Sequence, residues 1–234
     1  MKFDISAWRA WAPGISTEQE WLQWLNNPLH PVSTETADVS FLPAMQRRRL
    51  SPLARMVFHV AWPLAKTQPV VFCSRHGENV RNLELLKQVG EREALSPASF
   101  SLSVHNAIIG LWSIFREDRS EMTALAGNQD VLEHGLLEAW MLLEQGAESV
   151  LVVMAEDQQP ELYQPWITDA PFPYALALEI KAGDGFSLEL KTQQSKSAQS
   201  PWPHAINVLS LLLGQKNQLL QGVDTRQWLW SVRP

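Results

Sequence analysis

The chain has 234 residues, of which 45% are hydrophobic and 19% are charged, and its net charge is −6. It can bury one substantial core, and its acidic balance gives no broad basic surface for a phosphate backbone, so we expect no nucleic-acid partner. No apolar run approaches the roughly 20 residues of a spanning helix, and the start MKFDISAWRAW lacks an apolar signal segment. The single cysteine, Cys73, excludes an internal disulfide and fits a reducing compartment. We therefore expect a cytoplasmic protein without a membrane span.

In the first half of the chain, strand-like and helix-like spacings of apolar residues alternate. Ser16 is predicted to cap the first helix, and Gly90 to close the third. The expected elements are a strand over 3–13, helices over 16–25 and 51–65, a buried strand over 69–73 and a helix over 79–89.

The second half continues the alternation. It predicts a strand over 122–128, a long helix over 129–146 and a buried strand over 148–157. Residues 174–190 predict two antiparallel strands around the Gly-Asp-Gly turn at 183–185. A polar linker over 192–203 separates the domain expected over 1–191 from a C-terminal segment, 204–234, that packs on it. In this segment the sequence predicts a helix over 204–222 and a strand over 227–232. Strands alternating with helices favour a layered α/β fold with helices on both faces of the sheet.

The segment Arg75-His76-Gly77-Glu78 resembles the start of a histidine phosphatase. That reaction needs a second histidine and further arginines around the phosphoryl group. Some seventy residues precede this motif, and the nearest second histidine, His134, falls inside a predicted helix. The phosphatase interpretation therefore fails. Cys73 and His76 could form a thiol–imidazole pair, but a thiol in a buried strand is usually inert. No metal or cofactor motif is present, so neither is expected.

The stretch from residue 96 to residue 156 resembles the central part of a β-ketoacyl synthase. The features that carry this resemblance are Ser96-Pro97, Asn106 followed by Gly110, the helix end at Gly146 and the strand end at Ala155-Glu156. Upstream, RRRLSPLARMVFHVAWPLA resembles the helix before the synthase's second strand, and YALALEI resembles the strand that closes the first half of the fold. The resemblance covers roughly residues 1–190. It implies a thiolase-like half fold, layered α-β-α with a mixed sheet of the five-stranded type, equivalent to the N-terminal half of a ketosynthase.

Counting back from Gly146 places Gln129 where the synthase carries its nucleophilic cysteine. An amide cannot form the acyl thioester, so the resemblance implies no catalytic residue in this chain. It implies a half-size chain-length factor, a partner of a true β-ketoacyl-ACP synthase in aryl polyene or related type II polyketide and fatty acid biosynthesis, with acyl carrier protein as a transient partner. The alternative for Gln129 is a helix cap, or a count that is off by one or two positions.

The resemblance also implies an interface and a tunnel. The strand leading to the nucleophile pairs synthase dimers, which corresponds here to Met122, Thr123, Ala124, Leu125, Ala126 and Gly127. Val80, Leu83 and Leu86 recur at helical spacing, with His76 before them, and would line the partner's acyl tunnel. The alternative is that these residues are ordinary core residues. Two other functions stay open at this stage: a stand-alone acyl-thioester enzyme that uses Cys73 or His76, and a silent scaffold that binds acyl carrier protein.

Overall fold

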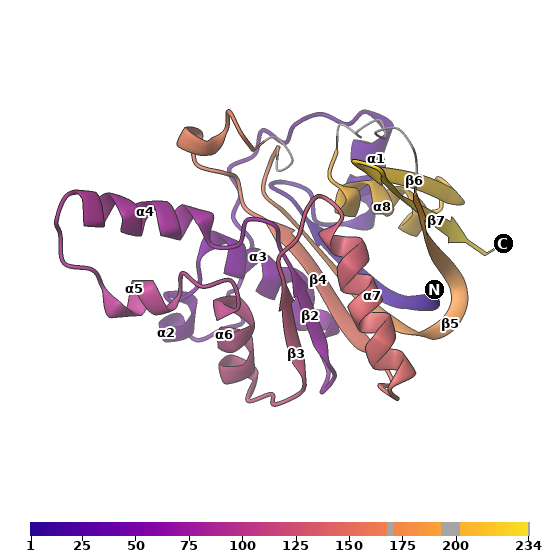
Figure 1. Ribbon diagram of the computed structural model, residues 1–234, viewed down its shortest axis with the longest axis horizontal. Helices are drawn as coiled ribbons and strands as arrows, with labels where there is room; N and C mark the ends of the chain where they lie inside the picture. The colour runs from indigo at the N-terminus through magenta and orange to yellow at the C-terminus, as the bar shows by residue number, and fades with distance from the viewer. Residues whose placement is uncertain (168–170, 193–201, 234) are drawn as a thin grey trace.

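The computed structural model describes residues 1–167, 171–192 and 202–233, and it contains one mixed β-sheet with helices around it (Figure 1). The strands are β1 (Lys2–Trp11), β2 (Val70–Cys73), β3 (Met122–Leu125), β4 (Val150–Glu156), β5 (Tyr174–Thr192), β6 (Gln218–Val223) and β7 (Arg226–Val232). The helices are α1 (Glu18–Asn26), α2 (Ala44–Arg47), α3 (Pro52–Ala61), α4 (Asn79–Gly90), α5 (Pro97–Ser101), α6 (Ala107–Arg116), α7 (Val131–Glu144) and α8 (His204–Leu212). Short 3₁₀ turns follow at Trp62–Leu64 and Glu161–Tyr163. The predicted linker falls largely outside the described residues.

The sheet has the strand order β3-β2-β4-β5-β7-β6, and β1 also pairs with β5. β2, β3 and β4 are parallel, whereas the pairings of β1, β4 and β7 with β5 and of β6 with β7 are antiparallel. The layered α/β fold with a mixed sheet is confirmed. The five strands expected of the half fold are β1 to β5, and the C-terminal hairpin β6–β7 extends the described sheet to seven strands.

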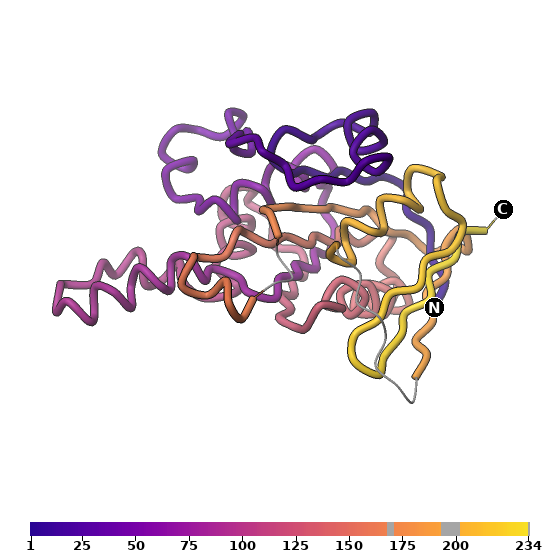
Figure 2. The backbone as a smooth tube through the Cα atoms, turned by 90° about the horizontal axis from the view of Figure 1, so that it is seen from above, coloured from indigo at the N-terminus to yellow at the C-terminus, as the bar shows by residue number. Residues whose placement is uncertain are grey.

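Side chains of the central strands alternate between two cores, as the two-residue period of a strand requires. Val71 and Cys73 face the core that α7 and α8 cover, while Val70 and Phe72 face the core that α3 and α6 cover. Figure 2 shows α7 and the α3 segment on opposite sides of the sheet. All seven residues of β4 are buried, as an uninterrupted apolar run between two helical layers predicts.

The predicted turn at Gly183-Asp184-Gly185 is wrong, because β5 runs through it as one strand of 19 residues. Opposite these residues, β1 shifts register between Phe3 and Asp4, which leaves a bulge in β5. The Asp4 carboxylate fills the bulge and accepts a hydrogen bond from the Gly185 N–H at 2.7 Å. A Cβ at Gly183 would lie 2.1 Å from the Asp4 Cγ. The glycines therefore make room for a carboxylate rather than reverse the chain.

Two further predictions need correction. The cap of α1 is Thr17 rather than Ser16: Thr17 and Glu20 form a reciprocal capping box, and Ser16 donates its N–H to the same Glu20 carboxylate. The last helix is shorter than predicted, because α8 ends at Leu212 and the backbone turns at Gly214, whose φ is +68°. The residues predicted to continue that helix form β6 instead.

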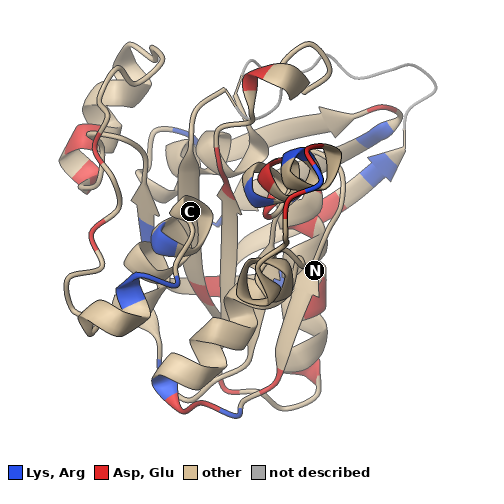
Figure 3. Ribbon diagram, turned by 90° about the vertical axis from the view of Figure 1, so that its left-hand side faces the viewer, with Lys and Arg blue, Asp and Glu red and all other residues tan. Residues whose placement is uncertain are grey.

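Helices α4 and α5 with their connection, residues 79–105, project away from the rest of the molecule (Figures 1 and 2). We call this segment the α4–α5 arm. Large apolar side chains are exposed along it, at Leu86, Val89, Leu95, Phe100 and Val104. Several large exposed apolar residues on one projecting segment are consistent with a surface that contacts another protein. Charged residues, in contrast to these apolar ones, do not gather on one segment. In the view of Figure 3, basic segments are interspersed with acidic ones, so this side of the molecule presents no continuous basic surface.

Candidate functional site

The three parallel strands β2, β3 and β4 end at the same edge of the sheet, and the turns that follow them form the candidate site. In open α/β sheets, this carboxyl edge is where ligands and catalytic groups collect. His76 lies in the turn after β2, Gln129 in the turn after β3, and Asp157 directly follows β4. The structure thus places the predicted position of the nucleophile and the predicted tunnel entrance at one edge.

The turn after β2 is held by the carboxylate of Glu156, a buried residue at the end of β4. This carboxylate accepts the N–H of Arg75, the N–H of His76 at 3.3 Å and the hydroxyl of Ser74 at 3.3 Å. Gly77 has φ +54°, and a Cβ there would lie 3.0 Å from the His105 ring. The Arg-His-Gly-Glu sequence therefore forms a tight structural turn, in which Gly77 supplies the left-handed conformation.

Gln129 is half-buried in the turn between β3 and α7. Its N–H donates to the Asn128 side chain at 2.9 Å, and the residue at the N-cap of α7 is Asp130. The interpretation of Gln129 as the helix cap is therefore wrong. Gly127 lies against the first residue of the helix, where a Cβ would come within 3.1 Å of the Val131 side chain. The turn is thus closely packed, and the amide side chains of Asn128 and Gln129 offer no nucleophile.

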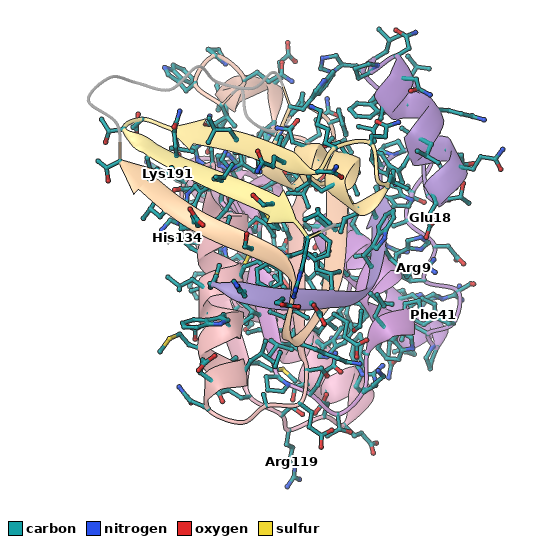
Figure 4. The ribbon with its side chains drawn as sticks, turned by 90° about the vertical axis from the view of Figure 1, so that its right-hand side faces the viewer. Arg9, Glu18, Phe41, Arg119, His134 and Lys191 are labelled. Carbon is teal, nitrogen blue, oxygen red and sulfur yellow. The ribbon has the colours of Figure 1, made fainter. Side chains whose placement is uncertain are left out.

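Two buried carboxylates follow Gln129 and fasten α7 to the C-terminal hairpin. Asp130 accepts two hydrogen bonds from the Arg226 guanidinium, at 2.8 and 3.1 Å, and one from the Trp228 indole at 3.0 Å. Burial alone would raise the pKa of Asp130, but these hydrogen bonds outweigh it and hold the pKa below its usual value. Figure 4 shows His134, one turn further along α7, facing the hairpin.

The second carboxylate, Glu133, is fully buried and accepts three donors on one oxygen. These are the His204 Nδ1 at 2.9 Å, the Gln221 amide at 3.0 Å and the Trp230 indole at 3.2 Å. Burial lowers the pKa of His204, yet the charge and hydrogen bond of Glu133 raise it more, so the net shift is upward. Sequence reasoning missed this network, because its members come from α7, α8, β6 and β7.

Cys73 is fully buried at the end of β2, beneath α7. Burial, followed by the charges of Glu133 and Glu156, raises the pKa of its thiol far above the usual value. The helix packs so closely that a Cβ at Gly135 would lie 2.2 Å from the Cys73 sulfur. A neutral, covered thiol is neither nucleophilic nor accessible, so the geometry contradicts an acyl enzyme based on Cys73.

The predicted interface strand, β3, is an edge strand whose described partner is β2 alone. Met122 and Ala124 lean toward the core under α6, whereas Leu125 leans toward the core under α7. Ala126 and Gly127 follow the strand and are exposed. An edge strand leaves N–H and C=O groups available for another chain.

The predicted tunnel residues do not share one environment. Leu83 is buried, with 8% of its surface exposed, whereas 60% of Leu86 is exposed. Val80 and His76 are half-buried. Among the three apolar residues, only Leu86 therefore presents most of its side chain to an incoming partner.

Among the described residues, no group of three or more His, Cys, Asp or Glu side chains has the arrangement of a metal site. The helices within the described ranges are also too short or too polar for any of them to cross a bilayer.

A family model, β-ketoacyl synthase N-terminal domain, matches residues 21–231. The chain therefore belongs to the β-ketoacyl synthase N-terminal domain family. Its structure is similar to a chain in the complex of the ketosynthase ApeO with its chain length factor ApeC from Xenorhabdus doucetiae. That match has 29% identity and a TM-score of 0.88, and it covers 99% of each chain.

Two more distant structures support the fold alone. The ishigamide ketosynthase/chain length factor matches 83% of this chain and 68% of its own, with 14% identity and a TM-score of 0.65. A β-ketoacyl synthase from Burkholderia phymatum matches 92% and 71% of the two chains, with 11% identity and a TM-score of 0.60. No curated protein sequence matches the chain.

Proposed function

We propose that this chain is a non-catalytic chain-length factor. It pairs with a β-ketoacyl-ACP synthase and shapes the acyl tunnel of that partner in aryl polyene or related polyketide and fatty acid biosynthesis. The observation that carries the proposal is the match, over 99% of both chains, to a chain of a ketosynthase–chain length factor complex. Acyl carrier protein is then a transient partner that delivers substrate to the ketosynthase.

The residues at the site support a role without chemistry. At the turn between β3 and α7, where the resemblance places a nucleophile, the chain has Gln129, and its one cysteine is buried beneath α7. Acyl transfer to an enzyme needs an accessible nucleophile that a base or a helix N-terminus activates. The buried Cys73 and the amide of Gln129 do not meet that requirement.

The features of β3 and of the α4–α5 arm support a pairing role. β3 is an edge strand, and the arm exposes Leu86, Val89, Leu95, Phe100 and Val104. Obligate interfaces are apolar and bury on the order of 2,000 Å² or more. We propose that β3 joins the partner's sheet and that the arm contacts the partner beside its tunnel.

The length of the acyl products tests the tunnel role most directly at Leu86, the most exposed of the three predicted tunnel residues on α4. With the partner ketosynthase, Leu86→Ala is expected to give longer acyl products than the wild type, because a packed side chain at the end of a tunnel stops growth sterically. Val80→Ala is expected to act in the same direction but less, since its side chain is already half-buried within this chain. Leu83→Ala is expected to destabilise this chain by about 2–5 kcal/mol, as a buried leucine does.

Product lengths are measured by mass spectrometry on the reconstituted pair. Leu190→Ala is the matched control, because Leu190 on β5 is similarly exposed, at 53%, and lies outside the arm. Products that keep the wild-type length with Leu86→Ala, while the pair stays assembled, would show that Leu86 does not limit chain growth.

A further inference from the structure

A cavity of about 280 Å³ opens at the carboxyl edge of the sheet between β2 and β4. Its walls come from the turn after β2, the start of α3, one side of α4 as far as Gln88, Ser99 on α5 and Asp157 after β4. The chain leaves β2 toward β3 on one side and then returns to β4 on the other side. Such a topological switch point is where open α/β sheets bind ligands. Gln129 does not line this cavity, so the cavity is distinct from the position of the missing nucleophile.

Most charged groups in the walls already have partners within the chain. The buried Glu78 accepts the Ser51 hydroxyl at 2.5 Å and the Arg81 guanidinium at 3.2 Å. Glu84, on the outer rim, forms a salt bridge with Lys87 at 2.8 Å. These groups build the wall but offer a ligand little further binding capacity.

Asp157 and Gln88 differ from these neighbours. Asp157 accepts the backbone N–H of Gln158 at 2.8 Å, and none of the described Lys or Arg residues forms a salt bridge with it. Burial, followed by the charge of Glu78, raises the pKa of Asp157 to about 6. Gln88 also lines the cavity, and its side-chain oxygen is covered by the protein and has no hydrogen-bond partner. The half-buried Asp157 carboxylate can accept further hydrogen bonds beyond the one from Gln158, and a ligand that donates could use this capacity.

A second cavity, of about 430 Å³, adjoins the first, because Pro52 and Asp157 line both. Its wall is largely apolar, with Trp11, Met56 and Pro173. Asp157 therefore lies at the boundary of two cavities, and the apolar walls of these cavities could contact the apolar part of an organic ligand. A few polar groups within apolar walls are the usual composition of a small-molecule site.

We propose that these adjoining cavities bind a small organic amine, with the ammonium group on the Asp157 carboxylate and the apolar body against the walls. A carboxylate without a cationic partner attracts an ammonium group and repels an anionic ligand of the same size. The first cavity includes Val80, which the proposed function places toward the partner's tunnel, so the binding test uses this chain without the ketosynthase and its outcome is separate from that of the pairing test.

The test uses hexylamine, with hexanol and hexanoate as probes of equal length, in calorimetric titrations of the whole chain. We expect hexylamine to bind most tightly. Its affinity should be about tenfold weaker at pH 5 than at about pH 7.5, because a carboxyl with a pKa of about 6 is mostly protonated at the lower pH. The other charged groups that line the two cavities are Glu78, Arg81, Glu84, Glu35 and Arg55.

Asp157→Asn is expected to weaken hexylamine binding by about tenfold or more at pH 7.5 and to remove its pH dependence. Asp224→Asn is the matched control. It removes the same charge at an exposed turn, where φ is +54° and asparagine is well tolerated, so it should bind like the wild type. Thermal melting confirms that each variant is folded. Equal binding of hexanol or hexanoate, unchanged pH dependence in Asp157→Asn, or binding of no probe would each overturn the proposal.

Discussion

Replacing Ala124 by proline is expected to abolish assembly with a ketosynthase while this chain remains folded. The N–H groups of Val70 and Ser74 donate to the carbonyls of Glu121 and Leu125, so these alternate residues of the β3 segment face β2. Because successive strand residues direct their N–H groups to opposite sides, the Ala124 N–H faces away from β2. Proline there removes a donor that this chain does not use, and edge strands tolerate it.

Leu220→Pro is the control for this variant. Leu220 lies on β6, the opposite edge of the sheet, and 54% of it is exposed. Since the Val232 N–H donates to Asn217, three residues before Leu220, the same alternation directs the Leu220 N–H away from β7. Both variants are co-expressed with the ketosynthase and analysed by size-exclusion chromatography. If the Ala124→Pro variant still co-elutes with the ketosynthase, as the Leu220→Pro variant is expected to do, the two chains do not pair through β3.

The second large effect is expected at Glu133. Glu133→Ala removes the acceptor of His204, Gln221 and Trp230 and leaves a buried histidine without its anion. Breaking a buried pair in this way costs about 3–5 kcal/mol of the free energy of unfolding. The measurement is urea denaturation followed by tryptophan fluorescence. Glu144→Ala, at the exposed end of the same helix, should change stability by less than about 0.5 kcal/mol.

The pH dependence gives this prediction a second readout. The pKa of His204 is higher in the folded state than in the unfolded state. The ion pair of His204 with Glu133 therefore stabilises the fold fully below the unfolded-state pKa, and this stabilisation is lost as pH rises through the folded-state pKa. Wild-type stability should therefore fall as pH rises above about 6.5, and Glu133→Ala should lack this component. We propose that residues 204–234 fold as one unit with residues 1–191. A separate early transition of the hairpin in Glu133→Ala would contradict that proposal.

Local sequence patterns predicted those elements whose burial is uniform. The apolar run of β4 and the apolar face of α3 are buried as expected, because each lies between the sheet and a helical layer. The turn predicted at Gly-Asp-Gly was wrong, because the conformation of this segment depends on Asp4, which is about 180 residues away in the chain. β6 was missed because Leu219 and Leu220 also fit a helical pattern, and only pairing with β7 makes the segment a strand.

The site was predictable in part. The Arg-His-Gly-Glu segment forms a turn after β2, but Gln129 lies in the turn before α7 rather than in the helix predicted to begin there. The carboxylates that organise this edge were not predicted. Glu156 and Asp157 do carry a signal, because two acidic residues directly follow the apolar run over 150–155. Glu133 carries none, since an acidic residue within a helix normally faces solvent.

The molar mass of the species that forms when this chain is co-expressed with its ketosynthase tests the central claim most directly. Light scattering coupled to size-exclusion chromatography gives that mass, and the account predicts one stable complex with equal numbers of the two chains. An obligate apolar interface of this class persists through dilution on the column. A chain that elutes alone, at the 26.5 kDa of its monomer and unaffected by the ketosynthase, would contradict the account.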